Sequence, residues 1–236
     1  MTTIDEIEAG IFRINTPVPE MPGGFSFNQY LVMDDEPLLF HTGPRALFPL
    51  VSQAIAKVVP VESLRWLAFS HFEADECGAL NELLAHAPLS TPVCSVVGAM
   101  ISVGDFAIRA PRGMKGGEVL RTGQRTLRWL DTPHMPHGWD CGYLFEEGSR
   151  TLLCGDLFTQ PGAVTPALTE GDILGPSEAF RGVNDYYSYT RHARPMLQNL
   201  AALAPRTLAC MHGSAWRGDG KKLLGALADT FERGLV

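Results

Sequence analysis

The sequence predicts one α/β domain over residues 1–236, in which β-sheets carry helices on their outer faces. Three observations favour this class. The length of 236 residues suits a single α/β domain. The composition, 45% hydrophobic and 19% charged, is that of a globular chain with a sizeable core. A group of strand-like segments followed by a helical pattern occurs twice along the chain, which is typical of sheets covered by helices.

The first part of the chain alternates short strands with helices. Two strands read as a hairpin around a polar turn, and one short segment is wholly apolar, as in a strand buried on both faces. Two other segments have apolar residues at helical spacing. The predicted elements are strands Ile11–Asn15, Asn28–Met33, Leu38–His41 and Trp66–Phe69, and helices Ala46–Val59 and Gly78–His86.

The remainder is first rich in strands and then helical. Gln160–Gly175 is rich in Gly, Pro and Thr and predicts a long loop. Asn184–Leu203 has the longest helical pattern, with Tyr186 and Tyr187 at its start. The other predicted elements are strands Val93–Val97, Gly117–Thr122, Arg125–Leu130, Cys141–Phe145, Arg150–Cys154 and Thr207–Met211, and a closing helix Gly220–Leu235.

Charge and composition argue against several classes of protein. The chain has 19 Lys and Arg against 26 Asp and Glu, with no basic cluster, so a nucleic-acid partner is not expected. No apolar run approaches the ~20 residues of a membrane helix. The acidic N-terminus lacks the apolar core of a signal peptide, so we expect a cytoplasmic protein. Five cysteines without a C-x-x-C pair do not suggest a disulfide framework.

Side chains of the kind that bind metals follow four of the apolar strands. Because functional sites gather at the carboxyl ends of strands in α/β folds, these four groups predict one shared metal site. Taken singly, a histidine in such a place is more often an ordinary loop residue, and an aspartate more often caps a helix. The groups are His71-Phe72-Glu73-Ala74-Asp75-Glu76, the run from Asp131 through His134 to His137, Gly155-Asp156, and His212-Gly213.

These motifs resemble the metallo-β-lactamase superfamily. The likeness is strongest to the diiron domain of flavodiiron proteins and to the stand-alone oxygen-binding diiron proteins related to it. In that branch the first motif is H-x-E-x-D, which stands here as His71, Glu73 and Asp75. The resemblance begins at Asn28 and runs to the His212-Gly213 pair and Trp216. It implies a four-layer αβ/βα sandwich of two mixed sheets flanked by helices.

The resemblance also implies a ligand set for two iron ions. One iron would take His71, Glu73 and His137, and the second would take Asp75 and His212. Asp156 would bridge the two. We assign His137 rather than His134 because its Gly-Trp-Asp context and its separation from Asp156 fit the family, which leaves His134 as a pocket residue.

Four residues depart from the family pattern or remain open. Glu76 follows Asp75 where the family often has His, and it is either a further carboxylate ligand or a helix residue facing water. His41 stands where the superfamily usually has Asp, so it alters the support of the site. Tyr186 and Tyr187 either reach the metal pocket and hydrogen-bond a bound gas molecule or pack as core aromatics.

The donor set favours iron over the alternatives zinc and manganese. Imidazole suits several metals, whereas carboxylates favour harder ions. Glu73, Asp75 and Asp156 bring negative charge that helps to neutralise an oxidised cluster. A zinc hydrolase has no oxidised state to stabilise and normally has His at position 73.

The expected function is therefore that of a diiron protein that binds or reduces O2 or NO, as an oxidoreductase or an oxygen sensor. The alternative is a zinc-dependent hydrolase of the same superfamily. No phosphate-binding loop is visible, so we expect neither FMN nor a flavodoxin domain in this chain. The protein would then need a separate electron donor or a signalling partner, and the resemblance also allows a homodimer.

Overall fold

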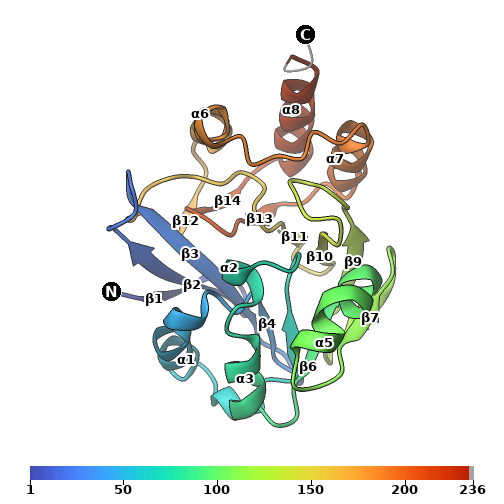
Figure 1. Ribbon diagram of the computed structural model, residues 1–236. Coiled ribbons are helices and arrows are strands. Elements are labelled where there is room, and N and C mark those ends of the chain that lie inside the picture. The colour runs from blue at the N-terminus through green and yellow to red at the C-terminus, as the bar shows by residue number, and fades with distance from the viewer. Residues whose placement is uncertain (234–236) are drawn as a thin grey trace.

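The computed structural model describes residues 1–233 and contains two seven-stranded sheets (Figure 1). The strands of the first sheet are β1 (Thr3–Glu8), β2 (Ile11–Val18), β3 (Phe25–Val32), β4 (Leu38–Phe40), β5 (Trp66–Ala68), β6 (Thr91–Ser95) and β7 (Arg112–Met114), in that order. Neighbouring strands are antiparallel from β1 to β4 and parallel from β4 to β7, so the sheet is mixed.

The second sheet is also mixed. Its order is β12 (Leu168–Thr169), β14 (Ala215–Arg217), β13 (Thr207–Ala209), β11 (Thr151–Leu153), β10 (Gly142–Glu146), β9 (Thr126–Asp131) and β8 (Val119–Arg121). The β11–β13 and β12–β14 pairs are parallel and the others antiparallel. The parallel pair β11–β13 brings the loops after these two strands to the same edge of the sheet.

Helices cover the outer face of each sheet (Figure 1). The first sheet carries α1 (Phe48–Ile55), α2 (Ala74–Cys77), α3 (Leu80–His86), and a bent segment made of α4 (Val96–Gly98), a π-turn (Ala99–Val103) and α5 (Gly104–Phe106). The second sheet carries α6 (Leu174–Asn184), α7 (Ala193–Ala202) and α8 (Gly220–Arg233). Short 3-10 turns occupy Arg45–Leu47 and Val61–Ser63.

Three apolar layers hold this arrangement together. The inner layer lies between the sheets and includes Tyr30, Trp129 and Leu144. The two outer layers join each sheet to its helices, through residues such as Leu83 of α3 and Leu197 of α7. Burial of these large side chains contributes roughly 1.5–3 kcal/mol each. The predicted four-layer sandwich of two mixed sheets flanked by helices is confirmed.

Several predicted elements need correction. The segment Asn184–Leu203 is not one helix, because α6 ends at Asn184, Asp185 adopts a left-handed backbone (φ 47°), and α7 begins only at Ala193. Tyr186 and Tyr187 therefore lie between two helices. The strand predicted over Val93–Val97 ends at Ser95, whose hydroxyl accepts from Gly98 N and so caps the bent helical segment.

Other predictions hold with small changes. The hairpin pairs Tyr30 with Phe40 in antiparallel register. The loop Gln160–Gly175 contains only the short strand β12 before α6 begins. The closing helix reaches Arg233, and the predicted last residues, Gly234 and Leu235, lie outside the described residues. Within residues 1–233, none of the helices is both long and apolar enough to cross a membrane.

Candidate metal centre

The four groups that follow apolar strands in the sequence meet at one edge of the two sheets. His71 and Glu73 lie in the loop after β5, and Asp75 and Glu76 lie on α2. The other three residues come from the second sheet: His137 from the loop between β9 and β10, Asp156 after β11, and His212 after β13. The cluster therefore joins the two halves of the sandwich.

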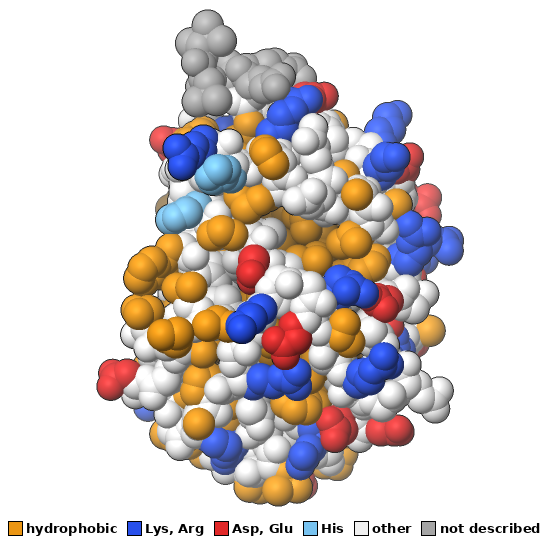
Figure 2. All heavy atoms as spheres, turned by 90° about the vertical axis from the view of Figure 1, so that its right-hand side faces the viewer, with side chains coloured by type: hydrophobic (Ala, Val, Ile, Leu, Met, Phe, Trp, Pro, Cys, Tyr) orange, Lys and Arg blue, Asp and Glu red, His pale blue; other side chains and the backbone are white. Residues whose placement is uncertain are grey.

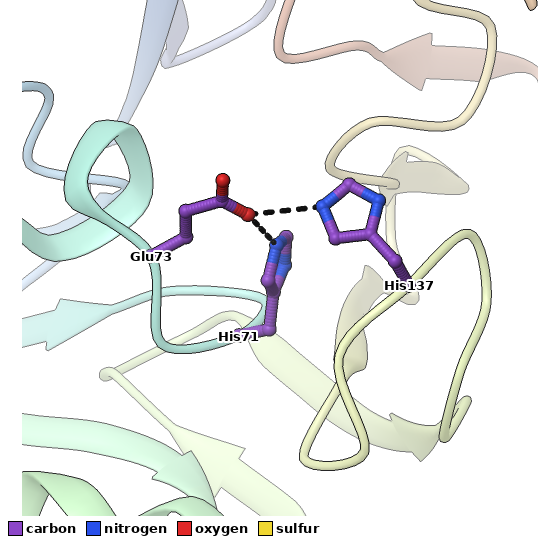
Figure 3. A group of neighbouring side chains, drawn as sticks. All are labelled: His71, Glu73 and His137. Atoms are coloured by element: carbon purple, nitrogen blue, oxygen red, sulfur yellow. Dashed lines mark hydrogen bonds and ion pairs between the residues drawn. The ribbon is translucent and has the colours of Figure 1, made fainter. Parts of the chain in front are cut away.

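One half of the cluster consists of His71, Glu73 and His137 (Figure 3). The Glu73 carboxylate lies between the two imidazoles, with Oε2 3.1 Å from His71 Nε2 and 3.0 Å from His137 Nε2. The Glu73 side chain is 52% exposed, whereas that of His71 is 2% exposed. This half is therefore open to solvent on the side of Glu73.

Asp156 lies between this half and a second one. Its Oδ2 is 3.7 Å from His71 Nε2 and 3.4 Å from His137 Nε2, and its Oδ1 is 3.3 Å from His212 Nε2. His212 Nε2 is also 3.5 Å from Asp75 Oδ2. One oxygen of Asp156 thus faces each half, which is the arrangement that a bridging carboxylate needs.

Glu76 is fully buried beside the cluster. Its Oε2 is 3.9 Å from His71 Nε2, and neither of its carboxylate oxygens has a hydrogen-bond partner among the described residues. The alternative in which Glu76 faces water is therefore wrong. Burial, followed by the neighbouring Asp156 carboxylate, raises the pKa of Glu76 well above its ordinary value. A buried carboxylate without a hydrogen-bond partner is costly unless a proton or a cation accompanies it.

The three histidines present the same ring nitrogen to the cluster. His137 Nδ1 donates to the carbonyl oxygen of Tyr186 at 2.9 Å, and His212 Nδ1 donates to that of Ser26 at 2.9 Å. His71 Nδ1 is 2.9 Å from Ser70 Oγ. Each Nε2 is thereby directed at the carboxylates. Metal-binding histidines are usually held in this way through their second nitrogen.

The charges of the cluster also fit a cation. Hydrogen bonds from His137 and His71 lower the pKa of Glu73 to about 2. Burial alone would lower the pKa of His212, but Asp156 and Asp75 raise it to about 10. In the metal-free protein these imidazoles therefore hold protons on the nitrogens that face the carboxylates. A bound metal would take the place of those protons, so the donor set suits a dinuclear site rich in carboxylates.

The other three predicted pocket residues, His134, Tyr186 and Tyr187, lie in three different surroundings. His134 is exposed, and it belongs to none of the ligand groups formed by residues 1–233. The Tyr186 ring centroid is 6.2 Å from that of His137, so Tyr186 borders the cluster. Tyr187 is 4% exposed and stacks on Phe231. Tyr187 is thus packed in the core.

Sequence reasoning missed the residues that support the histidines. Ser70 was visible beside His71, but the contact of His212 with the Ser26 carbonyl has no side-chain signature. Phe25 also supports the site, since its ring centroid lies 4.4 Å from that of His212. The contacts of Ser26 and Phe25 join β3 to the loop after β13. They depend on how the two sheets pack together, which the local sequence does not show.

Comparison with known proteins assigns the chain to a family and its fold to a known class. A family model described as ODP family beta lactamase matches residues 25–213, and the chain therefore belongs to this family. Its fold is the metallo-β-lactamase-like fold of flavodiiron proteins. Among curated proteins, it is 27% identical over 206 residues to the rubredoxin-oxygen oxidoreductase of Megalodesulfovibrio gigas, covering 84% of this chain and 50% of the relative.

A second group of relatives is named for a different activity. The chain is 24% identical over 212 residues to the anaerobic nitric oxide reductase flavorubredoxin of Salmonella paratyphi B, covering 85% of this chain and 43% of that protein. The chain thus spans about half the length of the curated relatives it matches.

Solved structures show the same fold. A single-residue mutant of the flavo di-iron protein from Thermotoga maritima superposes with a TM-score of 0.85 at 18% identity, over 98% of this chain and 61% of the other. A fragment of a putative diflavin flavoprotein from Nostoc sp. superposes with a TM-score of 0.83 at 18% identity, over 98% and 94% of the two chains.

Proposed function

We propose that this chain is a non-haem diiron protein that binds or reduces O2 or NO. The observation that carries the proposal is the cluster in which Asp156 directs one oxygen at each of two ligand groups. The names of the relatives, an oxygen oxidoreductase and a nitric oxide reductase, support this class of ligand. The electrons would come from a separate donor in the cytoplasm.

The proposed ligand set uses seven residues. One iron would be held by His71, Glu73 and His137, and the other by Asp75, Glu76 and His212, with Asp156 shared. Two ferrous ions held there would supply electrons and open coordination positions to a small gas molecule. The full burial of Glu76, with no hydrogen-bond partner among residues 1–233, supports its inclusion in the set.

The protein's own residues control access to the cluster and the positions of its imidazoles. Glu73 and His137 are the more exposed members, and Phe72 and Trp139 beside them are 38% and 55% exposed. His71, Asp156 and His212 form the buried base. A small molecule would therefore enter on the side of Glu73, while the backbone carbonyls of Tyr186 and Ser26 hold two of the imidazoles in place.

Glu73 distinguishes this proposal from the zinc hydrolase. Its carboxylate adds negative charge that favours iron and reduces the Lewis acidity available to a metal-bound hydroxide. We expect the protein loaded anaerobically with ferrous iron to react rapidly with O2 or NO, with a change in visible absorption in a stopped-flow experiment. The zinc-loaded protein should hydrolyse lactam, thioester and phosphodiester substrates slowly or not at all.

The variant Glu73→His tests the assignment directly. It should shift metal preference towards zinc and slow the gas reaction, whereas Glu62→His, at an exposed glutamate of the 3-10 turn Val61–Ser63, should behave as wild type. Efficient hydrolysis by the wild-type zinc form, together with an iron form inert to O2 and NO, would replace the proposal with the hydrolase.

A further inference from the structure

A row of four buried side chains leads away from the cluster, behind His71. His41 Nε2 is 3.0 Å from Ser70 Oγ, and Ser70 Oγ is 2.9 Å from His71 Nδ1. At the other end, His41 Nδ1 is 2.8 Å from Met211 Sδ. His41 and Met211 are completely buried, and Ser70 is 1% exposed. The order of contacts is therefore Met211, His41, Ser70 and His71.

The chemistry of Met211 fixes the direction of these hydrogen bonds. A thioether sulfur accepts a hydrogen bond but has no proton to donate, so His41 Nδ1 must carry the proton in this contact. The two hydrogen-bond partners of His41 are uncharged, and burial lowers the pKa of the His41 imidazole to about 3, so the ring is neutral. A neutral imidazole has one proton, and its Nε2 is then an acceptor.

The same reasoning fixes the donor and the acceptor in the hydrogen bond between Ser70 and His71. Ser70 has a single hydroxyl proton, which it donates to His41 Nε2, so its oxygen can only accept from His71 Nδ1. The reverse direction would place the lone pair of His41 Nδ1 against the sulfur lone pairs at 2.8 Å. We infer that His41 is a positioning residue that, through Ser70, keeps the proton of His71 on Nδ1 and leaves Nε2 free to bind metal. This inference rests on the proposed function in one respect, since it takes His71 as a ligand.

A pair of substitutions at Met211 separates this role from simple packing. Met211→Leu keeps the volume but removes the acceptor, so His41 can move its proton to Nε2 and reverse the direction towards His71. Zinc affinity should fall by about 10- to 100-fold, as is typical when the partner of a metal-binding histidine is lost. Met211→Gln restores an acceptor oxygen and should recover most of the affinity. A packing role predicts the opposite order, because burying an amide costs more than burying a leucine.

Ser70 provides an independent check. Ser70→Ala breaks the row, so it should weaken zinc binding by itself, and Met211→Leu should have no further effect in the Ser70→Ala background. Non-additivity of this kind is the mark of residues that act through one another. Thermal unfolding of every variant shows whether it is folded before its affinity is compared.

The experiment combines zinc titration against a competing chelator with imidazole ¹⁵N–¹H NMR of the full chain. We expect the His41 and His71 protons on Nδ1 in the zinc-loaded wild type, and the affinity order wild type, Met211→Gln, Met211→Leu. A His41 proton on Nε2, or a Met211→Gln protein that binds zinc more weakly than Met211→Leu, overturns the inference. If the wild type binds neither zinc nor iron, the proposed metal centre fails, and the His41 tautomer in the metal-free protein still decides the direction of the row.

Discussion

Glu76 is the residue whose effect on the stability of the protein should differ most between the metal-free and the metal-loaded form. Burial and the neighbouring Asp156 carboxylate raise its pKa well above the ordinary value of 4.5. A carboxyl group whose pKa is raised by folding favours the folded state when it is protonated. Its contribution is therefore complete below about pH 4.5 and is lost as the pH rises through the folded pKa.

Glu76→Gln replaces this buried ionisable group with a neutral side chain of the same shape. The metal-free variant should be more stable than metal-free wild type at pH 8, by at least about 1 kcal/mol, and the difference should shrink at pH 4. The metal-loaded variant should be less stable than metal-loaded wild type, because a ligand is lost. Urea unfolding at both pH values measures these differences, with Glu62→Gln as an exposed control. A metal-free Glu76→Gln protein that is less stable at pH 8 would contradict the account.

At the scale of elements, Asp34 joins the turn between β3 and β4 to the turn between β8 and β9. Its carboxylate accepts from Thr122 Oγ1 at 2.8 Å, Arg125 N at 2.7 Å and Gln124 N at 3.2 Å. Its slight burial acts in the opposite direction, but these hydrogen bonds lower the pKa of Asp34 below 3.8. The contact therefore stabilises the protein above that pH and is lost as the pH falls through the folded pKa.

Asp34→Ala should lower the free energy of unfolding by about 1–2 kcal/mol at pH 7, with a smaller loss below pH 3.8. Denaturant titrations at the two pH values measure the change. Asp35→Ala, at the exposed neighbouring residue, should have little effect at either pH. Equal losses from the two substitutions would show that the turn–turn contact does not depend on the Asp34 carboxylate.

The central strands could be predicted from sequence because they are short apolar runs between polar turns. β1 was missed because its sequence TIDEIE is largely polar and exposed at the edge of a sheet. The break at Asp185 was missed because apolar residues continue at helical spacing through Tyr186 and Tyr187. The local pattern of apolar residues therefore locates buried strands well. It does not show where a residue with a left-handed backbone conformation ends a helix.

The residues of the candidate site could be predicted from sequence, but some of their surroundings could not. The residues that converge follow strand ends and belong to a specific motif, so they could be named from sequence. The position of Glu76 could not, because helix N-terminal carboxylates usually face water. The row from His71 to Met211 was equally hidden, since it depends on the loop after β13 meeting the end of β4.

At the scale of the whole molecule, the cluster takes ligand-type residues from both sheets, so metal binding should stabilise the complete sandwich. A metal at 100 times its dissociation constant adds about 2.7 kcal/mol. For a chain of this size that corresponds to a rise of about 5–10 °C in Tm. Differential scanning calorimetry with and without a chelator measures the shift. An unchanged Tm after removal of bound metal would show that the cluster does not join the two halves energetically.

One face of the molecule shows how the charged side chains are distributed. On the face around α5, β7 and β9, Lys and Arg side chains are interspersed with Asp and Glu, without the continuous basic stripe that nucleic acid requires (Figure 2). The net charge of −7 agrees with this distribution.

The most direct test of the account is the number of iron ions that the chain holds, and its dependence on Asp156. After anaerobic loading with ferrous iron and removal of free metal, the wild type should retain about two ions per chain. Asp156→Asn should retain far fewer, because one residue serves both ligand groups. Asp140→Asn, a nearby buried substitution at the acceptor of Phe72 N, should still retain about two. Two ions in Asp156→Asn, or fewer than one in the wild type, would contradict the account.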